Sequence, residues 1–126
     1  MKTINDSELQ KLSCVKWTTP KERSFMQAVF VAASAAGAAS VDFVNEGEVI
    51  GAQMLTTDRM GAAIDDCFAC QDMWINFTGQ CGTRIGSIYV INQKTWHILE
   101  LVCDWEIDPW TDALMETIEA QFPEPE

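Results

Sequence analysis

The sequence is poor in histidine and in basic residues, and each shortage narrows the classes of protein to which it can belong. Its single histidine, His97, excludes a metal centre built from several histidines. Eight lysines and arginines stand against 19 aspartates and glutamates, which gives a formal net charge of −11. So acidic a surface repels nucleic acid and anionic membranes, and we expect no direct binding to either.

The sequence also lacks long hydrophobic runs and glycine-rich phosphate loops. No run of about 18 apolar residues is free of charges and helix breakers, so we expect no membrane span. The opening MKTINDSELQ has no apolar signal-peptide core, which favours a cytoplasmic protein. We expect its five cysteines to be reduced there. Because no nucleotide-binding loop is present, we predict no cofactor.

Charge is unevenly distributed along the chain. Five of the eight basic residues lie in the first 23 positions, whereas the residues after Lys94 include nine carboxylates and no basic residue. The C-terminal quarter therefore predicts an acidic surface, which either keeps the protein soluble or attracts a basic partner. The candidate acidic patch consists of Glu100, Asp104, Glu106 and Asp112.

With 126 residues, 48% of them hydrophobic, the chain fits one folded domain over residues 1–126. We expect residues 1–16 to be a short helix or a mobile arm, and the tail 123–126 to be disordered. Thr19, Pro20 and Glu22 form the signature of a helix start, which predicts a helix from Pro20 to about Ala39. Asp108 followed by Pro109 predicts the start of a last helix.

Between these helices we expect two hairpins separated by a third helix. The first hairpin joins 41–44 to 49–55 through the turn Asn45-Glu46-Gly47-Glu48. A helix capped by Thr57 or Asp58 follows, since apolar residues recur at helical spacing as far as Trp74 or Ile75, and Gly79 is its expected end. The predicted fold is α+β: an antiparallel sheet of about four to five strands with two to three helices, in the order (α)-α-β-β-α-β-β-α.

The second hairpin, 84–108, holds the densest run of β-branched and aromatic residues. A reversal at 92–95 would pair Val90 with His97 and Ile88 with Leu99. One face would then carry Leu101, Cys103, Trp105 and Ile107 toward the core. The other face would present a second apolar surface, which suggests an interaction face. Its candidate residues are Tyr89, Ile91, Trp96 and Ile98.

Three constellations carry candidate chemistry. Cys67 and Cys70 could supply half of the ligands of a zinc site, and Cys81 and Cys103 follow later in the chain. The first pair, however, falls in the apolar stripe of a predicted helix, where cysteine packs as a small hydrophobic residue. We therefore predict no metal. His97 lacks a recognisable nucleophile nearby, so an enzyme is the less favoured reading. A candidate aromatic pocket between sheet and helices consists of Trp74, His97 and Trp105, with Trp96 beside them.

These observations favour a non-enzymatic interaction module of adaptor, chaperone or inhibitor type. We expect a homodimer that binds another, possibly basic, protein through the hairpin face and the acidic surface. One alternative is a small-molecule-binding protein or minor enzyme that uses the aromatic pocket. A second alternative is an acidic inhibitor that imitates nucleic acid.

Overall fold

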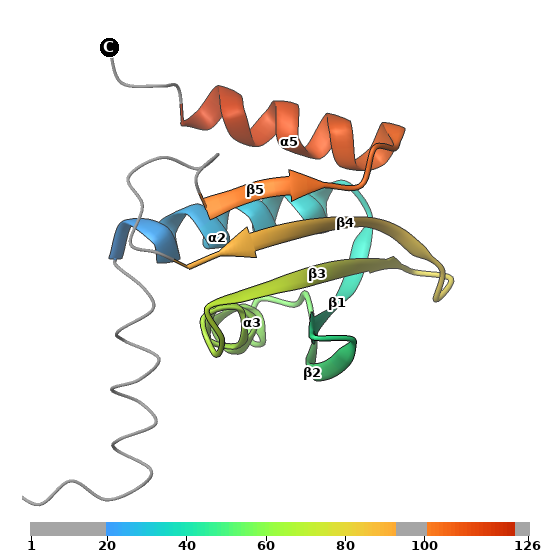
Figure 1. The fold of residues 1–126 in the computed structure, drawn as a ribbon. Helices are drawn as coiled ribbons and strands as arrows, with labels where there is room; N and C mark the ends of the chain where they lie inside the picture. The colour runs from blue at the N-terminus through green and yellow to red at the C-terminus, as the bar shows by residue number, and fades with distance from the viewer. Residues whose placement is uncertain (1–19, 93–100, 123–126) are drawn as a thin grey trace, which may run out of the picture.

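The computed structural model describes residues 20–92 and 101–122, which form three helices and one five-stranded sheet (Figure 1). The sheet is antiparallel throughout, with the strand order β2-β1-β3-β4-β5. The predicted α+β class is confirmed. The elements are α2 (Pro20–Ala35), β1 (Ala38–Asn45), β2 (Glu48–Met54), α3 (Met60–Cys67), β3 (Asp72–Gly79), β4 (Arg84–Ile91), β5 (Val102–Trp105) and α5 (Pro109–Gln121).

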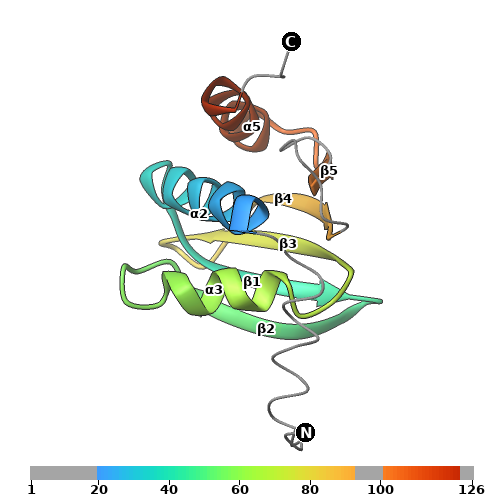
Figure 2. The ribbon, with the colours of Figure 1, turned by 90° about the vertical axis from the view of Figure 1, so that its left-hand side faces the viewer.

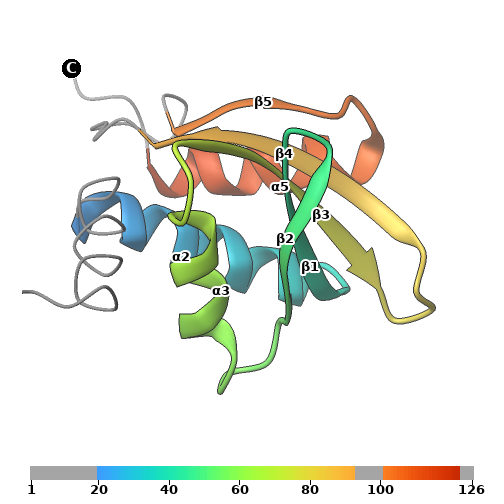
Figure 3. The ribbon, with the colours of Figure 1, turned by 60° about the horizontal axis from the view of Figure 1, so that its bottom comes forward.

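All three helices pack on the same face of the sheet (Figure 2). The ring of Phe30 in α2 contacts Phe43 of β1 and Phe77 of β3, with centroid distances of 6.3 and 6.4 Å. Toward one edge, Asp66 of α3 lies against Gly51 of β2. Toward the other edge, Trp110 of α5 covers a glycine of β4. The sheet twists strongly, so that β1 and β2 cross the direction of β4 (Figure 3).

The core fills the space between the helices and the sheet. Strands supply it with alternate residues, because side chains one residue apart point to opposite faces. Five phenylalanines are fully buried within it. The largest fully buried side chains are Phe25, Phe30, Phe43, Phe68, Phe77, Met26, Met73, Ile75, Ile88, Leu101 and Met115.

Local turn and cap signals predicted three elements well. Helix α2 begins at Pro20 as expected but ends at Ala35, and Gly37, with φ of +104°, then turns the chain into β1. The β1–β2 hairpin turns at Glu46 and Gly47, whose φ values of 52° and 82° suit a tight two-residue turn. Asp108 caps α5, since its Oδ1 accepts a hydrogen bond of 2.8 Å from the Thr111 amide.

The helix predicted to continue past Trp74 or Ile75 and to end at Gly79 is wrong in its second half. Helix α3 ends at Cys67, and the chain then forms β3 from Asp72. Residues Met73, Ile75 and Phe77 alternate into the core, which is strand periodicity. The central strand β3 was therefore missing from the predicted order.

The predicted register of the second hairpin is also wrong. Val90 pairs with Val102 and Ile88 with Trp105, so ten residues separate β4 from β5 where a short reversal was expected. The shift buries Val102, which the predicted alternation would place on the face away from the core, and it exposes Cys103. Ile107, assigned to the core, is 89% exposed. Leu101 and Trp105 do contribute to the core as predicted.

The described helices include none that is both long and apolar enough to cross a membrane. The predicted arm 1–16, the tail 123–126 and the Thr19 cap lie outside the described residues, as do Trp96, His97, Ile98, Leu99 and Glu100.

Candidate functional site

The face of the sheet opposite the three helices is covered by none of the described helices, and we call it the open face. Strand pairing places its side chains in transverse rows, because residues opposite each other on neighbouring strands point to the same side. Two of these rows span four and three adjacent strands, respectively. The apolar row consists of Val49, Val44, Trp74 and Tyr89, and the polar row consists of Asp42, Asn76 and Ser87.

The apolar row leaves hydrophobic side chains accessible to solvent. Val49 is 64% exposed and Trp74 is 37% exposed. The ring of Trp74 packs on the ring of Tyr89 at a centroid distance of 5.2 Å and a tilt of 47°. Ile91 continues the apolar surface along β4, opposite Asp72. A hydrophobic strip that crosses four strands is a typical contact surface for another molecule.

The polar row is a directed chain of hydrogen bonds. The Ser87 hydroxyl donates to Oδ1 of Asn76 at 2.6 Å, and the Asn76 amide donates to Oδ2 of Asp42 at 3.2 Å. Ser87 is only 2% exposed. Its proton is directed at an amide oxygen, which is not a base, so the arrangement orders the hydroxyl and does not activate it as a nucleophile.

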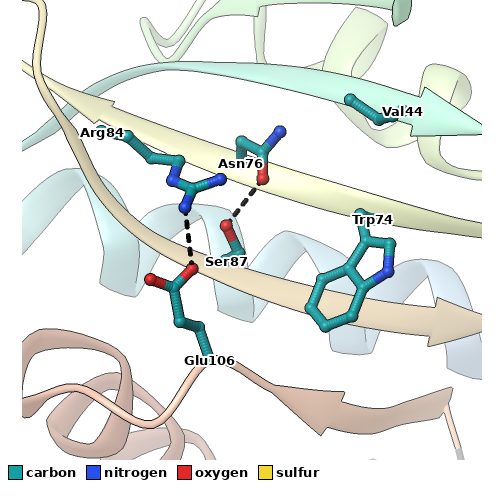
Figure 4. A pocket seen from close by; sticks show the side chains of 6 residues that line it. All are labelled: Val44, Trp74, Asn76, Arg84, Ser87 and Glu106. Carbon is teal, nitrogen blue, oxygen red and sulfur yellow. Dashed lines mark hydrogen bonds and ion pairs between the residues drawn. The ribbon is translucent and has the colours of Figure 1, made fainter. Parts of the chain in front are cut away.

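An open pocket of about 390 Å³ lies where the two rows meet (Figure 4). Its apolar side is formed by Val44 and Trp74, and its polar side by Asn76 and Ser87. Across its end, Arg84 and Glu106 form an ion pair of 3.3 Å. Both charged side chains are substantially exposed, so the pair exchanges readily with other charged groups. The pocket therefore combines an aromatic wall with groups that accept or donate hydrogen bonds.

Tyr89 is fixed within the apolar row by a carboxylate. Its hydroxyl donates a short hydrogen bond to Oδ2 of Asp72. This hydrogen bond, together with burial and the negative charge of Asp72, raises the pKa of Tyr89 to about 12. The hydroxyl is therefore protonated at neutral pH, and the ring is held against Trp74.

The predicted interaction face is only partly within the described structure. Tyr89 and Ile91 lie on the open face, while Trp96 and Ile98 lie outside the described residues. The β1–β2 hairpin adds Val44 and Val49 to the open face, and neither is among the predicted site residues. The alternation of apolar and polar residues in β1 and β2 does indicate that both side chains lie on one face. It does not show that Trp74 is the neighbour of Val44, because the residues of β3 are predicted to be helical.

The described residues of the candidate acidic patch lie in two places, next to the open face and on α5. Asp104 pairs with Tyr89 at the end of the apolar row, and Glu106 borders the pocket. Asp112, on α5, accepts a hydrogen bond of 3.2 Å from Nε1 of Trp105. Asp42, Asp72, Asp104 and Glu106 thus surround the apolar row with carboxylates, and Arg84 is the basic residue that borders the pocket.

The predicted aromatic pocket between sheet and helices is not formed as expected. Trp74 lies on the open face, whereas Trp105 pairs with the buried Ile88 and packs against the core. Because the two rings belong to opposite faces of the sheet, they do not line one cavity. His97, the third member, is outside the described residues.

The cysteines of the candidate zinc site lie apart. Cys67 is buried, and burial raises its pKa well above the ordinary value. Cys67 and Cys70 lie near Asn92, just past the end of β4, whereas Cys81 is in the turn before β4 begins. An eight-residue strand separates these ends by roughly 25 Å. No three potential metal ligands cluster among the residues that the structure describes.

Comparison with protein-family models, curated proteins and solved structures finds no match for this chain.

Proposed function

We propose that this protein is a protein-interaction module that binds an apolar, basic segment of another protein on the open face of its sheet. The observation that carries the proposal is the apolar row, in which Val49 and Trp74 remain accessible to solvent beside Val44 and Tyr89. A monomeric domain gains nothing in its own stability by presenting such a row, whereas a partner that buries it gains the hydrophobic contribution.

The charge around the row favours a basic partner. Four carboxylates surround the row, and the chain as a whole carries a net charge of −11. Complementary charge of this kind mainly accelerates association and selects the partner, while the aromatic contacts supply most of the affinity. We therefore expect a partner segment that alternates apolar side chains with lysine or arginine.

Selection from a displayed library of random peptides would test this proposal. Peptides enriched on the native protein are expected to combine apolar and basic residues, and their affinity should fall with increasing salt. Trp74→Ala should weaken the binding of an enriched peptide by at least about tenfold, as for an aromatic hot spot. Val31→Ala on α2 is the matched control, because Val31 is also exposed but lies on the helical side.

Two outcomes would count against the proposal. One is a library that yields no peptide with a preference for the native protein over Trp74→Ala. The other is a set of peptides that bind equally well at high salt and carry no basic residue. Circular dichroism of Trp74→Ala would first establish that the variant is folded, as its position outside the core leads us to expect.

The pocket supports a second candidate function, the binding of a small aromatic or apolar molecule with a polar group. Its volume of about 390 Å³ lies within the usual range for ligand sites, and Trp74 supplies an aromatic wall. A screen of fragments by protein-observed NMR would test this function. Shifts that concentrate on the amides of Trp74, Asn76 and Ser87 would support it, and shifts scattered over the surface would reject it.

A further inference from the structure

Strand β2 forms one edge of the sheet, and no described segment pairs with its outer side. In an antiparallel pair, the backbone N–H and C=O groups of one residue bond to the neighbouring strand, and those of the next residue point away from it. The amide of Leu55 donates to the carbonyl of Ala39 at 2.9 Å, which sets the phase of this alternation. Gly51 and Gln53 therefore bond to β1, while Ala52 and Met54 direct their N–H and C=O groups outward.

This edge lacks the features that usually prevent strands from adding to a sheet. Residues 49–57 contain no charged residue and no proline. Val49, Ile50 and Met54 are 64%, 43% and 53% exposed. The irregularity in the strand, at Ile50, lies at the hairpin end and leaves 51–54 regular. By contrast β5, the opposite edge, has four residues, and one of them is Asp104.

We propose that β2 pairs antiparallel with β2 of a second copy of this chain, so that two five-stranded sheets become one. A two-fold axis through Ala52 places Ala52 opposite its own copy and Ile50 opposite Met54 of the partner. Alanine is small enough for two copies of the residue to meet at the axis. Glu48 falls opposite Thr56 of the partner, so no two like charges face each other along the paired strands.

The lack of charged residues along 49–57 permits contact between copies at this edge. Two chains that each carry a net charge of −11 repel each other over most orientations. The uncharged stretch 49–57 lets two copies approach at this edge with little local repulsion. Beside it, an open hollow of about 360 Å³ lined by Ser40, Asp42, Ala52 and Met54 provides room for apolar side chains of the other copy.

The association is expected to be weak, because two paired edge strands bury much less than the area of about 1,600 Å² that is typical of a stable complex. The open faces of the two copies would then lie on the same side of the joined sheet, with Val49 opposite Leu55 of the partner. The proposal does not depend on the function proposed above, since it uses backbone groups of β2 and not the binding of a partner to Trp74.

Sedimentation velocity from micromolar to near-millimolar protein concentration tests the proposal. The native chain should pass from monomer to dimer over this range. Ala52→Lys should raise the dissociation constant at least tenfold, because it places two lysines against each other at the axis. The same change lowers the net negative charge, which by itself favours association, so a loss of dimer would originate at the edge.

Two controls make the experiment decisive. Ala52→Ser should retain the dimer, and Val31→Lys, which introduces the same charge on exposed α2, should leave it at least as stable. A native chain that is monomeric throughout the concentration range would overturn the proposal. So would a dimer that survives Ala52→Lys, or one that Val31→Lys disrupts to the same extent.

Hydrogen exchange of the native chain tests the same pairing without any variant. The amides of Gly51 and Gln53 should be protected at every concentration, since they bond to β1. The amides of Ala52 and Met54 should exchange quickly in dilute protein and slow down as the concentration rises. If the Ala52 amide exchanged at one rate at all concentrations, β2 would not be the contact between copies.

Discussion

The side chain of Asn92 closes the end of α3 by donating a hydrogen bond of 2.9 Å to the carbonyl oxygen of Cys67. The same amide group donates to the carbonyl of Cys70 at 2.7 Å, and Asn92 is fully buried. Helix ends leave carbonyls without partners, and a buried helix end needs them supplied from elsewhere. Asn92, just past the end of β4, therefore joins the sheet to the loop between α3 and β3.

We expect Asn92→Ala to lower the free energy of unfolding by about 2 to 4 kcal/mol, because two buried carbonyls lose their donors. Urea denaturation followed by circular dichroism measures this change. Gln80→Ala, at an exposed position in the β3–β4 turn, is the matched control and should change stability by less than about 0.5 kcal/mol. Equal effects of the two substitutions would show that Asn92 does not support the end of α3.

Two glycines should respond to alanine in opposite directions. A methyl group on Gly86 would overlap the side chains of Trp110 and Thr111, whereas one on Gly61 would meet nothing within 4 Å. Gly86→Ala should therefore destabilise the protein by about 1 to 3 kcal/mol through overpacking between β4 and α5. Gly61→Ala should stabilise α3 by up to about 1 kcal/mol. Thermal unfolding of both variants tests the contrast, and a stable Gly86→Ala would mean that α5 does not pack closely on β4.

Elements with strong local signals could be predicted from the sequence. Pro20 and Asp108 mark helix starts by the chemistry of the first helical turn, and Glu46-Gly47 marks a turn that requires positive φ. These signals depend on a few adjacent residues and hold in most surroundings. The fold class followed from their order along the chain.

The rest depends on contacts between distant residues. Ile64 and Phe68 have helical spacing and Met73 to Phe77 has strand spacing, so the apolar residues alone did not show where the helix ends; the cap from Asn92 decides it. The register of β5 follows from the burial of Val102 and Trp105 against β4. The open face was consequently predicted only where β4 forms it, because Trp74 and Val44 become neighbours of Tyr89 only once β3 lies in the sheet.

The thiols should differ in their rates of reaction with a disulfide reagent. A hydrogen bond between the Cys81 thiol and the Thr83 hydroxyl lowers the pKa of the exposed Cys81, whereas burial raises the pKa of Cys103. In a Cys14→Ser background, Cys81 should therefore react faster than Cys103 near neutral pH, since the thiolate is the reactive form. Cys67 should react only after unfolding, because it is buried and its pKa is raised well above the ordinary value.

Mass spectrometry of modified peptides at successive times would order these rates. Thr83→Val removes the hydroxyl next to Cys81 and should slow the reaction of that thiol while leaving Cys103 unchanged. A Cys67 that reacts in the native protein as fast as Cys103 would contradict the packing of α3 against the core.

Tyr89 should titrate at unusually high pH, and its titration can be followed alone because it is the only tyrosine in the sequence. The hydrogen bond to Asp72 raises its pKa to about 12 from an ordinary value of 10.0. The folded protein thus holds this proton more tightly than the unfolded chain does. The resulting stability is complete below about pH 10 and is lost as the pH rises toward 12. Absorbance of tyrosinate near 295 nm should accordingly show no transition until the pH exceeds 10.

The substitution Asp72→Asn tests how much the Asp72 carboxylate, rather than burial, contributes to the raised pKa of Tyr89. The substitution removes the negative charge next to the hydroxyl and weakens the hydrogen bond, so the tyrosine transition should move to lower pH. Asp104→Asn, opposite Tyr89 on β5, is the matched control and should have a smaller effect, since Asp104 does not accept a hydrogen bond from the hydroxyl. If the native protein titrated near pH 10, or if Asp72→Asn left the transition in place, Asp72 would not hold the ring of Tyr89 within the apolar row.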